Sequence, residues 1–193
     1  MNTIHNYKYK LIKKFFSKDE LSLLKIHCKK MILKPWRNDS ARATNNITPF
    51  WDNFSDPLAD VLLELKLKKM EKITGLKLFK TYAYWRYYHF GSFLKFHKDR
   101  EACEISVTAC MHKTDNWPIV INGKEIEMEE GDGVVYLGCE LEHGRKSKFT
   151  GDGMAQIFMH YVDQNGPYAS HKDDKINLIK KHGELKGEML LNS

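Results

Sequence analysis

Two histidines and an aspartate have the residue types and the spacing of a metal site. His97 and Asp99 stand two residues apart at the end of the aromatic run YYHFGSFLKFHKDR, residues 87–100. Side chains two residues apart in an extended chain point to the same side, so an imidazole and a carboxylate would enter one space. A third ligand would come from a distant strand, and His143 fits because it follows a glycine turn and a β-rich run. Two histidines and one carboxylate leave open coordination positions on Fe(II).

The same H-x-D pattern occurs a second time, so the motif alone is weak. His171 and Asp173 lie in a polar tail, where only His182 follows and no strand intervenes. We expect this copy to be exposed to solvent. On the motif alone, metal ligation and ordinary polar positions at strand ends explain His97 and His143 equally well.

The wider sequence resembles the prolyl-4-hydroxylase-like Fe(II)/2-oxoglutarate dioxygenases over about residues 80–165. The stretch YHFGSFLKFHKD is similar to the family's segment in which Y-x-x-G precedes H-x-D. The stretch WPIVINGKEIEMEEGDGVVYLGCELEHGR is similar to the later hairpin, turn and strand that lead to the distal histidine. AQIFMHYVD resembles the closing strand, and the segment before residue 76 matches only in style, as a helical support.

This resemblance implies a double-stranded β-helix, a jelly-roll or cupin-like fold, and a set of site residues. His97, Asp99 and His143 would be the iron ligands, and Tyr88 would hydrogen-bond 2-oxoglutarate. The implied reaction uses Fe(II), 2-oxoglutarate and O₂ to hydroxylate a C–H bond and releases succinate. Because Asp99 is present, the resemblance implies hydroxylation rather than halogenation, which in related enzymes vacates that ligand position.

One departure from the family concerns the cation that binds the C5 carboxylate of 2-oxoglutarate. The family usually has an arginine or lysine about ten residues past the distal histidine, where this chain reads GDGMAQ. Arg145, Arg86 and Lys148 are the three substitutes. We favour Arg145, because a planar guanidinium suits a carboxylate and only five arginines occur in the chain. A structural salt bridge is the alternative role for Arg145.

Helices are expected before residue 76 and strands after it. Ser17 and Glu20 form a capping box ahead of one helix, and Asp56 and Gly75 bound a second. Residues 37–55 are polar with aromatic islands, which favours a long loop that could serve as a lid over a peptide.

The strand-rich part predicts a small barrel or jelly roll with both helices on its outer face. Five runs have strand character, and Asn122-Gly123 between two alternating runs is a hairpin signal. The absence of βαβ alternation argues against a parallel doubly wound sheet. We expect one mainly β domain over residues 1–193, made of helical support and loop (1–75), β-helix core (76–165) and a C-terminal tail with a short helix (166–193).

Composition narrows the class of protein. The net charge of +6 leaves nucleic acid open as a partner, but the charges are spread along the chain and no RNA-binding signature is present. No apolar run is long enough to span a membrane and no signal peptide is evident, so a cytoplasmic protein with reduced, buried cysteines is expected.

The leading interpretation is an oxygenase acting on a peptide or a small molecule. A non-enzymatic cupin-like binding module and a basic nucleic-acid-binding domain are the alternatives. Two further features each have two interpretations. His160 could line the pocket or donate to a core carbonyl, and we favour the carbonyl. The aromatic run at 82–88 could form a substrate platform or the barrel wall, and we favour the wall.

Overall fold

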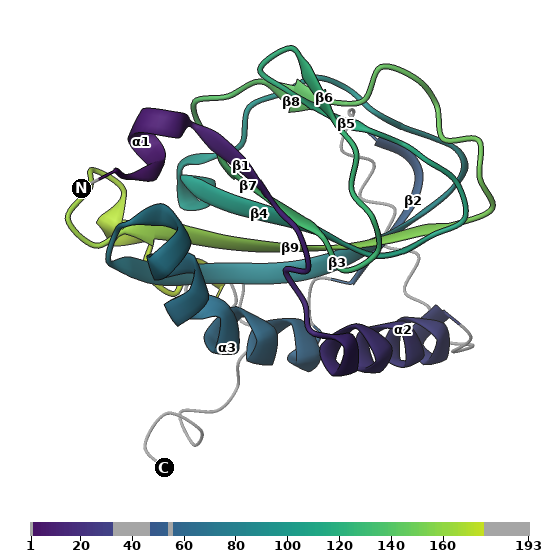
Figure 1. Cartoon of the computed structure of the whole chain (residues 1–193), viewed down its shortest axis with the longest axis horizontal. Helices are drawn as coiled ribbons and strands as arrows, with labels where there is room; N and C mark the ends of the chain where they lie inside the picture. Colours follow the sequence, from purple (N-terminus) through teal and green to yellow (C-terminus); the bar gives the residue numbers. More distant parts are fainter. Residues whose placement is uncertain (1, 33–46, 54–55, 176–193) are drawn as a thin grey trace.

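The computed structural model describes residues 2–32, 47–53 and 56–175. In the part of the chain that it describes, a six-stranded sheet has the order β1-β7-β4-β9-β3-β2 and a three-stranded sheet has the order β6-β5-β8. The small sheet lies opposite the large one, so the two enclose an interior (Figure 1). This is the double-stranded β-helix that the sequence predicts.

The paired strands are antiparallel, and most pairs join strands from distant parts of the chain. The elements in chain order are α1 (Ile4–Tyr7), β1 (Tyr9–Ile12), α2 (Lys18–Ile32), β2 (Ile47–Asn53), α3 (Pro57–Thr74), β3 (Leu78–Leu94), the 3₁₀ turn η1 (Glu101–Cys103), β4 (Ile105–Lys113), β5 (Ile119–Ile121), β6 (Lys124–Ile126), β7 (Gly133–Leu137), β8 (His143–Gly144), β9 (Met154–Asp163) and the 3₁₀ turn η2 (Ala169–His171).

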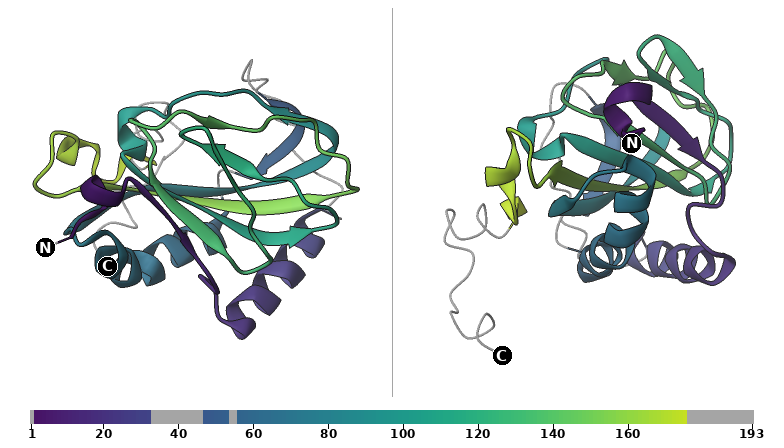
Figure 2. Two further views of the ribbon diagram at one scale, coloured as in Figure 1. Left: turned by 45° about the horizontal axis from the view of Figure 1, so that its top comes forward. Right: turned by 60° about the vertical axis from the view of Figure 1, so that its left-hand side comes forward.

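The two long helices cover the outer face of the large sheet, as predicted (Figures 1 and 2). At the start of α2, the Ser17 backbone N–H donates to Glu20 Oε2 over 2.8 Å and the Glu20 N–H donates to Ser17 Oγ over 3.2 Å. The Asp56 side chain caps α3 by accepting from the Leu58 N–H, and Gly75 ends the helix with φ +72°. Both capping predictions are therefore confirmed.

Strand alternation divides β3 into an outer and an inner set of side chains. Trp85 faces the helices, where its indole N–H donates to Asp56. Tyr84, Arg86 and Tyr88 have the opposite parity and line a pocket inside the barrel. The aromatic run is thus barrel wall, as expected, but its inner residues also form the pocket.

The prediction of a loop over residues 37–55 is wrong in part. Residues 47–53 form strand β2, which pairs antiparallel with β3 from Ile47 opposite Leu94 to Asn53 opposite Trp85. The register shifts between Thr48 and Phe50, a bulge that obscures the alternation a sequence pattern would need. Residues 33–46 and 54–55 lie outside the described residues, so the lid stays a prediction.

Other local predictions have mixed outcomes. The hairpin turn is confirmed, because Asn122 (φ +50°) and Gly123 (φ +77°) both adopt the left-handed region between β5 and β6. Helix α1 was not expected. In the C-terminal tail, η2 is followed by Asp174 and Lys175, which are also helical, and positions 176–193 lie outside the described residues.

The remaining global expectations concern cysteines and the membrane. All four cysteines are free, and Cys28, Cys103 and Cys110 are buried. Among the described residues, the helices all lack the length and apolar character that crossing a membrane would require.

Candidate metal centre

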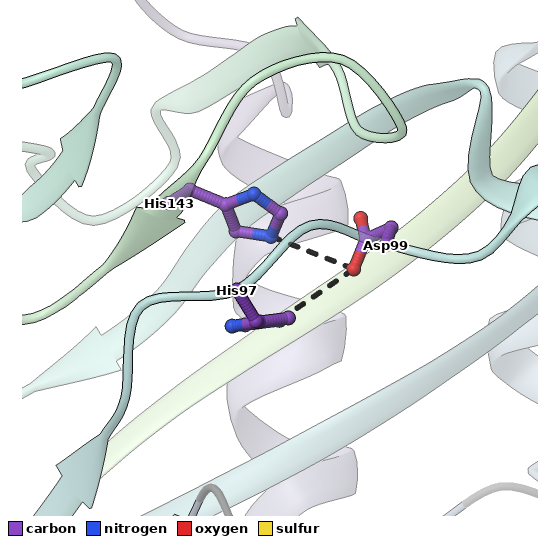
Figure 3. Close-up of side chains that lie close together, drawn as sticks. All are labelled: His97, Asp99 and His143. Carbon is purple, nitrogen blue, oxygen red and sulfur yellow. Dashed lines mark ion pairs between the residues drawn. The ribbon is translucent and has the colours of Figure 1, made fainter.

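Three side chains from two distant segments converge in the interior. Asp99 Oδ1 lies 3.6 Å from His97 Nε2 and 3.5 Å from His143 Nε2 (Figure 3). The three ligand atoms all lie within 4.8 Å of one another. Two ligand atoms that each sit about 2.1 Å from one ion are at most about 4.2 Å apart, so both separations from Asp99 suit a shared metal.

Backbone pairing holds the two histidines together. His97 and His143 exchange two backbone hydrogen bonds, each 2.9 Å from nitrogen to oxygen, although no regular strand contains His97. On its other side, β8 pairs with β5, with His143 opposite Ile121. The small sheet therefore sets the position of the distal histidine.

Both imidazoles are oriented by the carbonyl two residues earlier in the chain. His97 Nδ1 lies 2.9 Å from the Lys95 oxygen, and His143 Nδ1 lies 2.9 Å from the Leu141 oxygen. Because a carbonyl only accepts, each Nδ1 carries a proton, and Nε2 is the ring nitrogen that faces Asp99. This arrangement is typical of metal-binding histidines.

Asp99 is also held by its backbone and by its side chain. The Asp99 backbone N–H donates to the Gly138 oxygen over 3.0 Å, and Asp99 Oδ2 lies 3.2 Å from Ser106 Oγ. Burial by itself would raise the pKa of Asp99, but hydrogen bonds from His143 and His97 lower it well below its ordinary value. Asp99 is therefore ionised and suited to a divalent cation.

The triad opens onto a narrow pocket of about 30 Å³. Besides the triad, the residues that line it are Tyr84, Arg86, Tyr88, Leu94, Thr108, Ile119, Tyr136, Gln156, Phe158 and His160. The His97 side chain is 26% exposed and the His143 side chain 3%, so solvent reaches the centre from the His97 side. A larger pocket of about 410 Å³, between α2 and the ends of β3, β4 and β9, contains no triad residue.

Arg145 is buried inside the barrel rather than placed on the surface. Its Nη2 donates to Gln156 Oε1 over 3.0 Å, and its guanidinium carbon lies 4.4 Å from the centroid of the Trp117 ring. Burial lowers the pKa of Arg145 to about 10, so it remains a cation at neutral pH. Tyr88 packs edge-on against the same Trp117 ring, with centroids 5.0 Å apart.

Several buried polar groups beside Arg145 have no hydrogen-bond partner within the described ranges. They are the Tyr88 hydroxyl, Nε and Nη1 of Arg145, and Nε2 of Gln156. A buried donor without a partner is costly, so such a group marks a place for a ligand. All four can donate a hydrogen bond, and together they suit a carboxylate.

The other two candidate cations differ from Arg145. Lys148 is exposed, which argues against a role in the pocket. Arg86 lines the pocket and packs 5.8 Å from the Tyr88 ring centroid. At Gly153, ten residues past His143, an added Cβ would lie 1.8 Å from the Tyr87 hydroxyl, so a longer side chain does not fit there.

Sequence reasoning missed two contributors and misjudged a third. Gln156 and Ser106 were not predicted, because their strands are buried along nearly their whole length and show no alternation of burial that would mark an inward face. His160 lines the pocket, the alternative that we did not favour, and contacts the Ser106 hydroxyl instead of a carbonyl. In the second H-x-D copy, His171 is half-buried beside Glu101 and Asp174 and belongs to no metal-type grouping of described residues.

Comparison with known proteins identifies relatives by structure only. No family model matches the sequence, and no curated protein matches it. A prolyl-4-hydroxylase from Pseudomonas putida is similar, with a TM-score of 0.64 and 16% identity over 83% of this chain and 95% of that one. HygX from Streptomyces hygroscopicus, solved with nickel, 2-oxoglutarate and hygromycin B, has a TM-score of 0.61 and 9% identity over 82% and 84% of the two chains.

A third similar structure is EctD from S. alaskensis with bound Fe, with a TM-score of 0.60 and 14% identity over 81% of this chain and 73% of that one. The shared feature is the fold, which is that of the 2-oxoglutarate–Fe(II) oxygenases. The resemblance noted in the sequence is therefore confirmed at the level of fold.

Proposed function

We propose that this protein is an Fe(II)- and 2-oxoglutarate-dependent oxygenase that hydroxylates a C–H bond. The observation that carries the proposal is the convergence of His97, Asp99 and His143, with both Nε2 atoms facing one carboxylate oxygen. Two imidazoles and one ionised carboxylate match the ligand set of non-haem Fe(II) oxygenases. The fold similarity to iron- and 2-oxoglutarate-bound oxygenases supports the same assignment.

The residues around the centre also fit the cosubstrate. The C5 carboxylate of 2-oxoglutarate would accept hydrogen bonds from Arg145 and Tyr88, whose buried donors have no partner among the described residues. Gln156 would supply a further donor through Nε2. Arg145 thus takes the role of the cation that the family usually carries near position 153.

The pocket must widen for this ligand. Its volume of about 30 Å³ holds one or two water molecules at most. We infer that a long lining side chain moves when 2-oxoglutarate enters. Arg86 is the longest side chain in the pocket wall and extends over the aromatic rings of Tyr84 and Phe158.

When bound, ferrous iron would supply the redox chemistry that couples oxidative decarboxylation of 2-oxoglutarate to hydroxylation of a substrate. The chain's own contribution is to hold the reactants and exclude water. Leu94, Ile119 and Phe158 give the pocket an apolar wall, which keeps side reactions with water low. The more exposed side at His97 is where a substrate would approach.

We propose two substrate classes, a peptide and a small molecule. One similar structure is a prolyl-4-hydroxylase, and another was solved with hygromycin B. We expect the substrate to reach the iron from the half-exposed side of the centre.

The test is anaerobic reconstitution with Fe(II) and 2-oxoglutarate, followed by admission of O₂. We expect a visible iron-to-2-oxoglutarate charge-transfer band, and slow succinate formation even without substrate. His97→Ala should abolish both, whereas His171→Ala, from the second H-x-D copy, should retain them. A wild-type protein that binds neither iron nor 2-oxoglutarate would rule the proposal out and favour a binding module.

A further inference from the structure

A chain of buried hydrogen bonds leads from the ligand carboxylate to a histidine outside the triad. Ser106 Oγ lies 3.2 Å from Asp99 Oδ2 and 2.9 Å from His160 Nδ1. Ser106 is fully buried and His160 is 3% exposed. The chain begins on the Asp99 oxygen that faces away from the two histidine ligands.

The proton positions in this chain follow from the types of atom involved. The Ser106 hydroxyl has one proton and lies near two groups that only accept, Asp99 Oδ2 at 3.2 Å and the Cys103 carbonyl at 3.1 Å. Its proton therefore goes to one of them, and His160 Nδ1 must donate to the hydroxyl oxygen. Burial lowers the pKa of His160 to about 4, so the ring is neutral and Nε2 carries a lone pair.

The surrounding backbone leaves the side chains of this hydrogen-bond chain little room to move. An added Cβ at Gly138 would lie 2.6 Å from Asp99 Oδ2, 2.7 Å from Ser106 Oγ and 2.4 Å from the Cys103 carbonyl oxygen. The backbone of the β7 exit therefore closes over the carboxylate. Since Asp99 cannot rotate into this backbone, Oδ2 stays beside Ser106, where the hydroxyl can donate to it.

A second grouping of metal-type residues overlaps this chain. Asp99, Cys103 and His160 also place ligand atoms within 4.8 Å of one another. The Cys103 sulfur instead contacts the Tyr82 hydroxyl at 2.9 Å, and burial raises the pKa of its thiol, which opposes the thiolate that a metal needs. This grouping therefore orders hydrogen bonds rather than a second ion.

We propose that His160 is a positioning residue, which acts through Ser106 to aim Asp99 Oδ1 at the metal and presents its own Nε2 as an acceptor to the pocket. Among the described residues, Nε2 of His160 has no hydrogen-bond partner, although the side chain lines the pocket. The inference rests on the proposed metal site. It adds a residue that family resemblance did not assign.

The first test measures the affinity of Mn(II) by calorimetry and the absorption spectrum of the Co(II) form. Ser106→Ala should weaken Mn(II) binding by about 10- to 100-fold, the usual effect of removing a partner of a metal ligand, and should alter the Co(II) spectrum. Thr74→Val is the matched control, because it also removes a buried hydroxyl, one that donates to the Met70 carbonyl near the end of α3 and does not line the pocket. It should leave both readouts unchanged.

The second test exchanges His160 itself. His160→Asn keeps an N–H near the position of Nδ1 and should bind Mn(II) almost as the wild type does, whereas His160→Leu should be as weak as Ser106→Ala. Nitrogen-15 NMR of the wild-type histidine side chains should show a proton on Nδ1 of His160 and none on Nε2.

The outcomes separate the inference from the proposed function. If the wild type binds no Mn(II), the metal site fails. If it binds Mn(II) but Ser106→Ala matches Thr74→Val, or if Nε2 of His160 carries the proton, the site stands and the positioning role is overturned.

Discussion

His97 and His143 form a two-residue antiparallel bridge, with both backbone hydrogen bonds at 2.9 Å and ring centroids 4.4 Å apart. The metal site is therefore closed by the backbone as well as by side chains. Gly144 permits this approach, because a Cβ there would lie 2.9 Å from Cα and N of Phe96. An added Cβ at these distances would force the two segments apart.

Gly144→Ala should accordingly weaken metal binding without touching a ligand. The added methyl pushes against the Phe96 backbone, which cannot rotate away as a side chain could, so we expect at least a 10-fold loss of Mn(II) affinity. Overpacking of this kind also costs stability, by about 1–3 kcal/mol. Calorimetry and thermal unfolding measure the two effects.

The control for this change is Glu142→Ala, which alters an exposed side chain on the other side of His143. It should leave metal affinity within twofold of the wild type. Wild-type affinity in Gly144→Ala would show that the bridge does not set the ligand geometry.

Much of this centre could be predicted from local patterns. The spacing of His97 and Asp99 placed two ligands on one side, and the turn before β7 pointed to His143 as the third. Arg145 was favoured because arginine is scarce in the chain and lies two residues past His143. These local signals did not decide the ligand roles by themselves, because ordinary polar positions explained the motif equally well, and the family resemblance was needed to favour ligation.

The rest depends on contacts between distant segments. Ser106 and Gln156 resemble any inward polar residue until β4 and β9 are paired, with Ser106 opposite His160. Strand β2 was predicted as loop because its segment is polar with aromatic islands, and only its pairing with β3 identifies it as a strand. Pairing partners and register are tertiary properties, which a single sequence does not specify.

Arg145→Met should weaken the cosubstrate and spare the metal. Loss of a charged donor to a carboxylate costs about 1.5–3 kcal/mol for each hydrogen bond, so we expect about a 100-fold weaker affinity for N-oxalylglycine, an unreactive analogue, with Mn(II) present. Mn(II) affinity alone should change little. Lys148→Met, which removes an exposed lysine, should change neither. If Arg86→Met gives the larger loss, Arg86 is the anchor.

Gln156→Glu, beside Arg145, should lower the affinity for the cosubstrate without lowering the stability of the fold. The new carboxylate would replace the Gln156 oxygen that lies 3.0 Å from Arg145 Nη2 and would form a buried ion pair. That pair would compete with 2-oxoglutarate for the guanidinium and repel its negative charge, so affinity for N-oxalylglycine should fall by about 100-fold or more. Thermal stability should not fall, because the buried arginine gains a partner. Unchanged analogue affinity would place the cosubstrate elsewhere.

Asp132→Asn should show a pH-dependent loss of stability. Asp132 accepts from the Lys14 and Glu129 backbone N–H groups, each at 3.0 Å, and pairs with Lys13 Nζ at 2.7 Å. Burial raises its pKa, but these hydrogen bonds outweigh burial and lower it. A carboxyl with a lowered pKa in the folded state stabilises the fold above its unfolded pKa of about 3.9, and this contribution disappears as the pH falls through the folded value.

The free energy of unfolding of Asp132→Asn should therefore be about 1–2 kcal/mol lower than that of the wild type at pH 7, and the difference should shrink below about pH 4. Urea unfolding at a series of pH values measures it. Glu127→Gln makes the same charge change on a nearby exposed side chain and should give no such difference. A deficit in Asp132→Asn that stays constant down to pH 2 would mean that shape, not the ionised carboxylate, explains the loss, because only a charge-dependent contribution vanishes on protonation.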